Sequence, residues 1–414
     1  MANTLNLGTD GNWATKEDSL LAYNSENGNF KPLPFDFTRA SSATVVNKAG
    51  LIETVGSGEP RIDFKDDANG ALLLEPQRSN LVAYSEAFNE TYWSKSRVTV
   101  TQNNVVSPDG TLNADKLIET SDTGLHAISS NTTVTSGVSH TFSVFIKKGS
   151  SNLIQFLFGT NNVTGNPYVN FDVNNGLLQN NGVDSANIEN YGNGWYRCSA
   201  TYVTATTAFT NFISPIQSIS DSRVSSFTGN VNNNIYIYGA MIEQGSYATS
   251  YIPTSGSAVT RVADACNNTG NDQVFNDSEG VIYFQLSYSD TNDAGYLQIS
   301  DGTSDNRIII WNLTSTSLRG LVVVGGAAQA QINGGIISSN TTFKVALKYK
   351  TNDFALWVDG VKVGADVSGL TFGSNVLNKI DLSVNTVEFK GNVKDVRVYN
   401  TALTDAELTA LTKI

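Results

Sequence analysis

Short runs of alternating apolar and polar residues, bounded by Gly, Asn and Ser, recur along most of this chain and constrain its fold. The clearest run is TTFKVALKYK at 341–350. Its apolar and basic side chains separate onto two faces: Phe343, Val345, Leu347 and Tyr349 against Lys344, Lys348 and Lys350. Alternation with period two is the pattern of a strand with one buried face. We therefore predict a chain built mainly of antiparallel strands.

Turn and cap signals favour the same fold class. Asp359-Gly360 separates two apolar runs and is a dipeptide that a two-residue hairpin prefers. Thr404 and Glu407 form a capping box, which predicts a short helix through about Leu411. Only 15% of the residues are charged, and Gly is abundant, as expected for an all-β protein with many turns. A length of 414 residues favours two or three domains.

The charge balance excludes two kinds of partner. The net charge of −12 and the lack of any basic run argue against nucleic-acid binding, which needs clustered Lys and Arg. The same sign disfavours adsorption to anionic membranes, and no apolar run approaches the roughly 20 residues of a spanning helix. The sequence MANTLNLGTDGNW lacks the basic and apolar regions of a secretory signal, so we expect no signal peptide.

The distribution of strand signals divides the chain into five parts. We predict an all-β protein with two tandem antiparallel β-sandwich (jelly-roll) domains, an N-terminal arm and a short C-terminal helix. The parts are an arm at 1–36, a motif segment at 37–81, a sandwich at 82–253, a linker at 254–276 and a sandwich at 277–414. We expect the arm either to attach the protein to a particle or to add a strand to the first sandwich.

The motif segment holds four short patterns. They are T-R-A-S-x-A-T at 38–44, G-L-I at 50–52, P-R-x-D-F at 60–64 and L-L-L-E-P-Q-R-x-N-L at 72–81. The series resembles an element of bacteriophage tail-fibre and other virion surface proteins. This resemblance implies a phage structural protein, located on the virion, assembled in the host cytoplasm and released by lysis. It says nothing about a ligand.

Both predicted sandwiches resemble carbohydrate-binding families. W-S-K at 93–95, G-N-G-W-Y-R at 192–197 and the closing phrase at 237–254 are similar to galactose-binding-like carbohydrate-binding modules. W-x-D-G-x-x-V at 357–363 and G-x-V-x-x-V-R-V-Y-N-x-A-L-T-x-x-E at 391–407 resemble the concanavalin-like or laminin-G-like jelly roll. Carbohydrate binding is what these resemblances imply.

Together the resemblances imply a non-enzymatic phage virion protein, in a tail fibre, tail tip or head fibre, that adheres to a bacterial cell-surface glycan. Its further partners would be other virion proteins and copies of itself, with a homotrimer as the expected oligomer. Two alternatives stay open. One is a polysaccharide depolymerase or its binding module, and the other is an architectural capsid-decoration protein without a ligand.

No catalytic arrangement is evident in the sequence. His126 and His140 belong to no triad or zinc motif, and no G-x-S-x-G, phosphate-binding loop or H-E-x-x-H occurs. Glycosidases need two carboxylates roughly 5 to 10 Å apart. The nearest candidates, Asp381 and Glu388, have an odd spacing that places them on opposite faces of a regular strand. We therefore predict no enzyme activity and name no catalytic residue.

Calcium is the one cofactor with some support, because both resembled families often hold a structural Ca²⁺ through loop carboxylates. The candidate ligands are Asp290, Asp293, Asp301 and Asp305 in the second sandwich, and Glu86 and Glu243 in the first. The alternative is that these acids are solvated. Cys198 and Cys266 are too few for a cysteine-based metal cluster, and we expect two free buried thiols, with a disulfide left open.

Sugar binding usually rests on an aromatic ring with planar polar groups beside it. Trp357 follows core-facing Leu356, so alternation places it on the opposite face, and it is the first candidate for a ligand platform. Trp311, at the end of RIIIW, and Trp93 are the next candidates. Trp195 lies within a predicted strand and is expected in the core.

Overall fold

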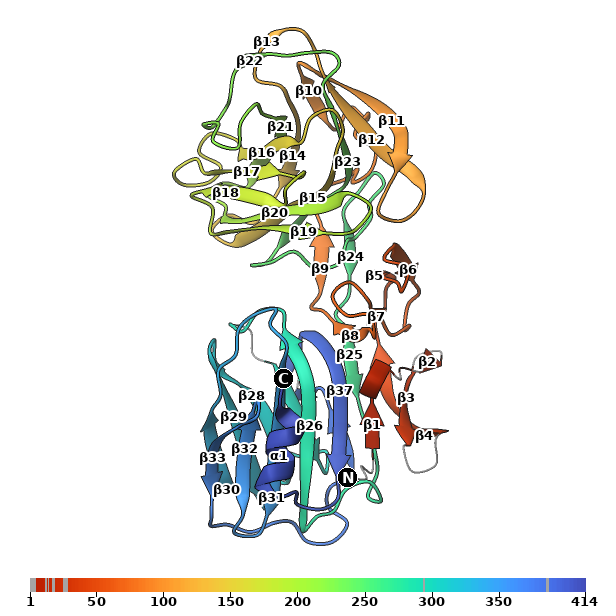
Figure 1. Cartoon of the computed structure of the whole chain (residues 1–414), viewed down its shortest axis with the longest axis vertical. Coiled ribbons are helices and arrows are strands. Elements are labelled where there is room, and N and C mark those ends of the chain that lie inside the picture. The colour runs from red at the N-terminus through yellow and green to blue at the C-terminus, as the bar shows by residue number, and fades with distance from the viewer. Residues whose placement is uncertain are drawn as a thin grey trace. The chain divides into compact units, whose positions relative to one another are not determined.

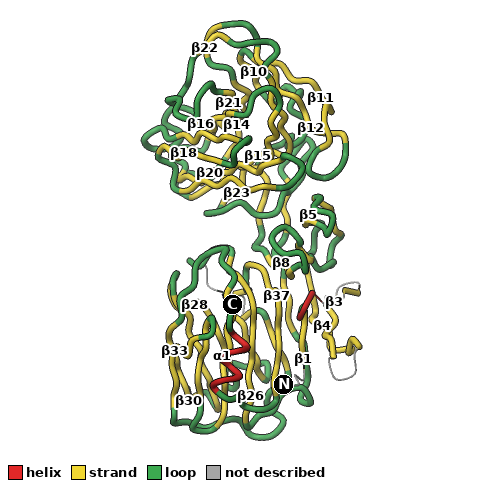
Figure 2. Tube along the Cα trace, in the orientation of Figure 1, coloured by secondary structure: helices red, strands yellow, loops and turns green. Residues whose placement is uncertain are grey.

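The protein is nearly all β, as the sequence predicts (Figures 1 and 2). The computed structural model describes residues 5–11, 13, 15–16, 19–24, 29–292, 295–384 and 387–414. The chain divides into two compact units: unit 1 holds 1–48, 55–76 and 262–414, and unit 2 holds 49–54 and 77–261. Within the described ranges there is one α-helix, α1 (Asp405–Thr412). No described helix has the length and apolarity to cross a bilayer.

Unit 1 is a β-sandwich of two sheets. The large sheet runs in the order β25-β4-β3-β1-β37-β26-β31-β32-β33, with β2, β7 and β8 beside this path. Its strands are β1 (Leu5–Leu7), β2 (Thr15–Lys16), β3 (Ser19–Asn24), β4 (Asn29–Thr38), β7 (Ile62–Asp63), β8 (Ala71–Leu74), β25 (Ala265–Asn267), β26 (Glu279–Tyr288), β31 (Phe343–Lys350), β32 (Phe354–Val358), β33 (Val361–Asp366) and β37 (Gly391–Tyr399). The small sheet holds β30 (Ala327–Gly334), β29 (Ser317–Val324), β28 (Arg307–Thr314), β27 (Tyr296–Ser300) and β34 (Lys379–Asp381), in this order.

The core of unit 1 lies between these two sheets. Ile282 and Phe284 of the large sheet and Ile308 and Ile310 of the small sheet belong to one buried cluster. The predicted inward face of β31 is confirmed, because its four apolar side chains all join this cluster: Phe343, Val345, Leu347 and Tyr349. The expectation of a single buried face is wrong, because Ala346 and Lys348 on the other face are buried as well. The outer face of each sheet is the face that points away from this core.

Helix α1 covers part of the outer face of the large sheet (Figure 1). Leu403 and Leu408 pack there against Val281, Ala346 and Trp357 in a second buried cluster. The helix starts at the predicted capping box, in which the Glu407 backbone N–H donates to the Thr404 hydroxyl. The Thr404 backbone N–H in turn donates to the Glu407 carboxylate at 2.8 Å. The predicted hairpin turn is also present, with positive φ at both Asp359 and Gly360.

The boundaries of the two units differ from the predicted parts at the N-terminus and the linker. Strand β1, in the predicted arm, pairs antiparallel with β37, and Leu5 lies opposite Val398. Strand β25, in the predicted linker, pairs with β4. Leu5, Leu7 and Cys266 are buried in the core of unit 1. These strands are too short to show a period-two pattern in the sequence, yet they extend the large sheet.

The motif residues form a buried ionic cluster around Asp264. Arg39 Nη1 lies 3.1 Å from Asp264 Oδ1, and Arg61 binds the other carboxylate oxygen. Arg61 Nη1 also lies 2.6 Å from Glu75 Oε2, and the Glu75 backbone N–H donates to Asp264. Burial acts to lower the pKa of Arg61, but Glu75 and Asp264 raise it above its ordinary value. Two cations thus balance two anions, which buried charges require.

Unit 2 is a second β-sandwich. One sheet holds β10 (Ser94–Ser96), β14 (Ala127–Thr133), β21 (Ala208–Pro215), β16 (Leu153–Phe158), β17 (Tyr168–Asp172) and β18 (Leu177–Asn181). The other holds β11 (Val98–Val106), β12 (Leu112–Glu119), β23 (Asn234–Gln244), β15 (Ser139–Lys148), β20 (Trp195–Val203) and β19 (Ser185–Asn190).

The remaining short elements of the two units are η1 (Thr9–Gly11), β5 (Ala43–Val46), β6 (Ile52–Val55), β9 (Arg78–Asn80), β13 (Thr123–Gly124), β22 (Phe227–Thr228), β24 (Val259–Arg261), β35 (Ser383–Val384) and β36 (Val387–Glu388).

The core of unit 2 packs large side chains from both sheets, including Phe142, Phe156 and Phe171. Cys198 lies in this core, and both cysteines are free and buried, as expected. Trp195 is also buried, as expected, and its indole N–H donates to the Val106 carbonyl at 3.0 Å.

Candidate functional site

Trp357 points to the outer face of the large sheet, as alternation predicts, but α1 covers it. Its side chain is 0% exposed and packs beside Leu408. Lys348 and Lys362 place their ammonium groups 5.8 and 5.1 Å from its ring centroid. A sugar therefore has no access to this ring in the folded chain. Alternation indicates the face of a residue but not what covers that face.

Trp93 is likewise enclosed, in unit 2. It is 1% exposed, and its indole N–H donates to the Tyr84 carbonyl at 2.8 Å. Phe88 and Tyr92 pack against it, with ring centroids 4.8 and 5.6 Å away. Trp93 is therefore part of the hydrophobic core of unit 2, not of its surface.

Trp311 is the predicted platform that remains accessible. Its neighbours in sequence, Ile308 and Ile310, face the core, so Trp311 lies half-buried on the outer face of the small sheet. The strand register places four side chains in one row across β27, β28, β29 and β30: Tyr296, Trp311, Arg319 and Asn333. We call this set the Trp311 row.

Contacts along the Trp311 row connect each residue to the next. The Tyr296 and Trp311 ring centroids are 5.9 Å apart, with a 32° angle between the ring planes. The Arg319 guanidinium carbon lies 5.3 Å from the Trp311 ring centroid. Arg319 Nε donates to Asn333 Oδ1 at 2.7 Å. The row therefore presents aromatic rings, a cation and an amide side by side, with its orientation fixed by these contacts.

A second row of residues flanks the Trp311 row. Gln298 lies two residues along β27 from Tyr296 and opposite Asp381 of β34, whose carboxylate it reaches at 3.3 Å. The Oε1 atom of Gln298 is buried without a hydrogen-bond partner among the described residues. A buried acceptor without a hydrogen bond costs folding free energy, so a donor that reached it would stabilise the structure.

Two of the predicted calcium ligands in the second sandwich, Asp290 and Asp301, accept hydrogen bonds from neighbouring residues. Asp290 Oδ1 accepts from the backbone and side chain of Asn292. Asp301 accepts from Thr303 and Asn306, and these bonds outweigh burial and lower its pKa. Asp305 is exposed, and Asp293 lies outside the described residues.

The two predicted ligands in unit 2 are also held by protein donors. Glu86 accepts from the Tyr251 and Tyr238 hydroxyls at 2.9 and 3.1 Å, and burial raises its pKa. Glu243 accepts from the Thr249 N–H and hydroxyl at 2.9 and 2.6 Å and lies 3.6 Å from Arg78. Within the described ranges, no group of three His, Cys, Asp or Glu side chains is placed to hold a metal ion.

The two carboxylates considered for catalysis belong to different strands. Asp381 ends β34 and is held by the Asn268 N–H at 2.9 Å and by Lys379 at 3.4 Å. Glu388 ends β36, which pairs with β35, so the assumption of one regular strand does not hold. In unit 2, His126 and His140 are buried, and burial lowers the pKa of His140.

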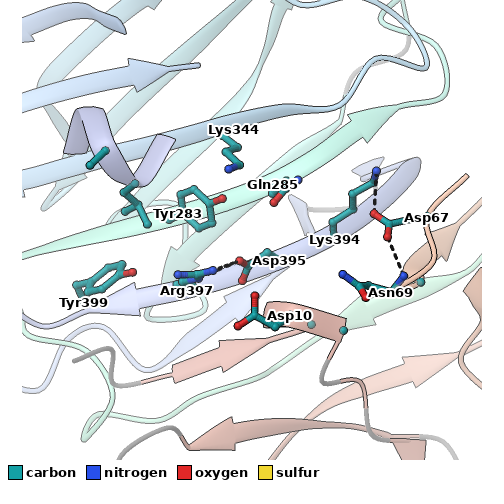
Figure 3. Close-up of a pocket in the computed structure, with 15 residues that line it drawn as sticks. Asp10, Asp67, Asn69, Tyr283, Gln285, Lys344, Lys394, Asp395, Arg397 and Tyr399 are labelled. Atoms are coloured by element: carbon teal, nitrogen blue, oxygen red, sulfur yellow. Dashed lines mark hydrogen bonds and ion pairs between the residues drawn. The ribbon is translucent and has the colours of Figure 1, made fainter. Parts of the chain in front are cut away.

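A pocket of about 510 Å³ lies in unit 1, on the outer face of the large sheet (Figure 3). Tyr283 and Gln285 of β26 and Asp395 and Arg397 of β37 form its floor. Segments on either side supply the walls: Gly8, Asp10, Gly11, Asp67, Asn69, Gly70, Lys344, Lys394, Tyr399, Ala410 and Leu411. Sequence analysis did not identify this site, because its segments come from both ends of the chain.

Ion pairs order the charged groups of this pocket (Figure 3). Arg397 Nη2 lies 2.5 Å from Asp395 Oδ2, and Lys394 Nζ lies 3.1 Å from Asp67 Oδ2. Burial raises the pKa of Asp395, and the ion pair with Arg397 opposes this effect. The Thr9 hydroxyl donates to the second oxygen of Asp395 at 2.7 Å.

Comparison with known proteins supports a lectin-like sandwich in unit 1. Residues 267–409 match the family model described as the Concanavalin A-like lectin/glucanases superfamily, and this region includes the whole Trp311 row. The matched region is less than half of the chain. No curated protein matches the sequence.

Several solved structures are similar at low identity. The CBM40 of the Ruminococcus gnavus IT-sialidase, bound to α2,3-sialyllactose, is 20% identical over 36% of this chain and 94% of its own, with a TM-score of 0.31. Domains LG4–5 of the mouse laminin α1 chain are 11% identical over 69% and 89%, with a TM-score of 0.25. The SAP-like pentraxin of Limulus polyphemus is 11% identical over 32% and 68%, with a TM-score of 0.26. Scores this low carry no functional argument.

Proposed function

We propose that this chain is a non-enzymatic bacteriophage virion protein that attaches the particle to a bacterial cell-surface glycan, with the Trp311 row as its binding site. The observation that carries the proposal is the register of the row. Four side chains of complementary chemistry meet on the outer face of a sheet within the lectin-like region 267–409.

The chemistry of the row suits a saccharide. A pyranose has an apolar C–H face that stacks on an aromatic ring and hydroxyls that need planar donors and acceptors. Trp311 and Tyr296 supply the aromatic surface, while Arg319 and Asn333 supply the polar groups. Because Arg319 is already held by Trp311 and Asn333, little side-chain entropy is lost on binding.

The phage assignment is supported by the motif segment and its architecture. The motif arginines Arg39 and Arg61 form buried ion pairs with Asp264. The motif therefore acts as a structural element and not as a ligand site. A homotrimer on the virion would place several Trp311 rows on one particle. Weak binding at each row would then give stronger overall binding, because the first contact raises the effective concentration of the glycan at the other rows. Light scattering of the purified chain tests the trimer, and a monomeric mass at all concentrations would contradict it.

A microarray of bacterial surface polysaccharides, probed with the full chain, tests the glycan-binding function. We expect at least one polysaccharide to bind the wild type and to lose most of its signal with Trp311→Ala. The matched control is Tyr236→Ala, which removes a half-buried aromatic side chain in unit 2 and should leave binding unchanged. Binding of no polysaccharide would favour an architectural protein. Release of shortened glycan from a bound polysaccharide would favour a depolymerase.

A further inference from the structure

We propose that the pocket on the outer face of the large sheet is a second saccharide site, which takes one neutral sugar residue. It lies on the opposite outer face of unit 1 from the Trp311 row, because the shared core separates the two sheets. This second site rests on the proposed glycan binding but involves different residues. An experiment can therefore exclude either site without excluding the other.

Tyr283 and Gln285 add two polar groups to the pocket floor. The Arg397 guanidinium carbon lies 5.4 Å from the Tyr283 ring centroid, which fixes the ring. Within the described residues, neither the Tyr283 hydroxyl nor the half-buried Gln285 amide is among the buried polar atoms without a partner, so water in the pocket reaches both. A ligand can therefore replace that water without breaking a hydrogen bond inside the protein. One hydroxyl and one amide together offer the donors and acceptors that a sugar hydroxyl uses.

Glycines bring the pocket walls close to the sheet. Gly8 has φ of 74°, and an added Cβ would lie 2.3 Å from the Trp13 ring and 2.5 Å from the Lys394 carbonyl oxygen. Gly70 has φ of 77°, and its Cβ would lie 2.7 Å from Ile62. The Trp13 indole N–H donates to the Gly70 carbonyl at 3.1 Å, which ties the two walls together. A larger residue at either glycine would push a wall away.

The two glycine-containing walls lie outside the region that matches the lectin family model. Gly8–Gly11 and Asp67–Gly70 precede residues 267–409, whereas the floor belongs to that region. The pocket therefore exists because this chain adds β1, η1 and the β7–β8 loop to the edge of a lectin-like sheet.

The charges of the pocket indicate a neutral ligand. Three cations and three anions line it: Lys344, Lys394, Arg397, Asp10, Asp67 and Asp395. Two of the cations are already paired with pocket carboxylates. The third, Lys344, donates to the Lys413 carbonyl at 2.8 Å. An acidic sugar would have to break one of these contacts or lie near an unneutralised carboxylate, whereas hydroxyls can use the existing groups as they stand.

Saturation-transfer NMR on the full chain tests this site, with D-galactose, D-glucose, L-rhamnose and N-acetyl-D-glucosamine as neutral probes and N-acetylneuraminic acid as the acidic probe. The measurements use the Trp311→Ala background, which removes the first platform. We expect at least one neutral probe to bind there and the acidic probe not to bind.

Three further variants in that background locate the binding. Ala410→Trp fills the pocket from an exposed helix position and should abolish probe binding. Tyr283→Phe removes only the hydroxyl and should weaken binding about 3- to 10-fold, the worth of one hydrogen bond. The matched control is Tyr349→Phe, because that hydroxyl already donates to the Asn276 carbonyl at 2.8 Å on the core side. It should leave binding unchanged.

Other outcomes overturn the inference in distinguishable ways. If Trp311→Ala abolishes all probe binding while Ala410→Trp alone preserves it, the pocket is no sugar site and the proposed function stands. If a probe binds equally well to Ala410→Trp in the Trp311→Ala background, its site lies elsewhere. Preference for the acidic probe would contradict the neutral-ligand assignment.

Discussion

Arg39 and Asp264 are separated by 225 residues in the chain, yet Nη1 of the first lies 3.1 Å from Oδ1 of the second, with both side chains fully buried. Arg61 binds the other oxygen of the same carboxylate. A single acid therefore holds two motif arginines at the place where the chain re-enters unit 1. This contact gives the motif segment a structural role that its sequence does not reveal.

Replacement of this acid should destabilise unit 1. Asp264→Asn leaves two buried guanidinium groups with one fewer counter-charge, and breaking a buried ion pair in this way typically costs about 3 to 5 kcal/mol. The free energy of unfolding from a urea titration measures the effect. The control is Glu279→Gln, whose ion pair with the exposed Lys350 lies at the surface and should matter little. Equal stability of the two variants would contradict the structural role of the cluster.

Two tryptophans on the outer faces of the two sheets should have opposite phenotypes when replaced. Trp357→Ala removes a fully buried ring beneath α1 and should cost about 3 to 5 kcal/mol of folding free energy. Trp311→Ala removes a half-buried ring and should leave the melting temperature within a few degrees of the wild type while it weakens glycan binding at least tenfold. Thermal unfolding and glycan binding of both variants separate the two roles. A large loss of stability with Trp311→Ala would count against its role as a surface platform.

Asp63, in the P-R-x-D-F motif, should make stability depend on pH. Burial raises its pKa to about 6, and a hydrogen bond from the Val46 N–H opposes this effect. An acid with a higher pKa in the folded state binds its proton more tightly when folded, so its contribution to stability falls as pH rises from about 4 to 6. Asp63→Asn should therefore gain stability relative to the wild type over this range. A stability difference that stays constant between pH 4 and 7 would exclude this linkage.

The capping box should contribute to stability through α1. Thr404→Ala removes the hydroxyl that accepts the Glu407 N–H and should cost about 1 kcal/mol. Thr401→Ala, at an exposed position just before the helix, is the control and should be neutral. Chemical unfolding of both variants measures the difference. No effect of Thr404→Ala would mean that α1 is held by its apolar contacts alone.

The sequence predicts local structure well where a single short pattern of residues determines it. Period-two alternation identified the inward face of β31, and the Asp359-Gly360 turn and the Thr404–Glu407 cap are as expected. The same rule oriented Trp357 correctly but could not show that α1 covers it. Burial by a distant element depends on tertiary packing, which alternation does not encode.

The candidate sites were less predictable for a related reason. Trp311 could be named as a candidate, but its partners Arg319 and Asn333 follow from strand register, which one sequence does not fix. The pocket depends on β1 and β37 meeting across nearly the whole chain length. Three-residue strands such as β1 have no periodic signal, so sequence reasoning assigned them to an arm.

Isothermal titration of the full chain with the strongest glycan from the microarray tests the central claim most directly. The wild type and Trp311→Ala are compared, with Tyr236→Ala as the control. We predict that Trp311→Ala weakens binding at least tenfold, which corresponds to about 1.4 kcal/mol, while the control binds as the wild type does. Equal affinity of Trp311→Ala and the wild type would contradict the assignment of the Trp311 row as the glycan site.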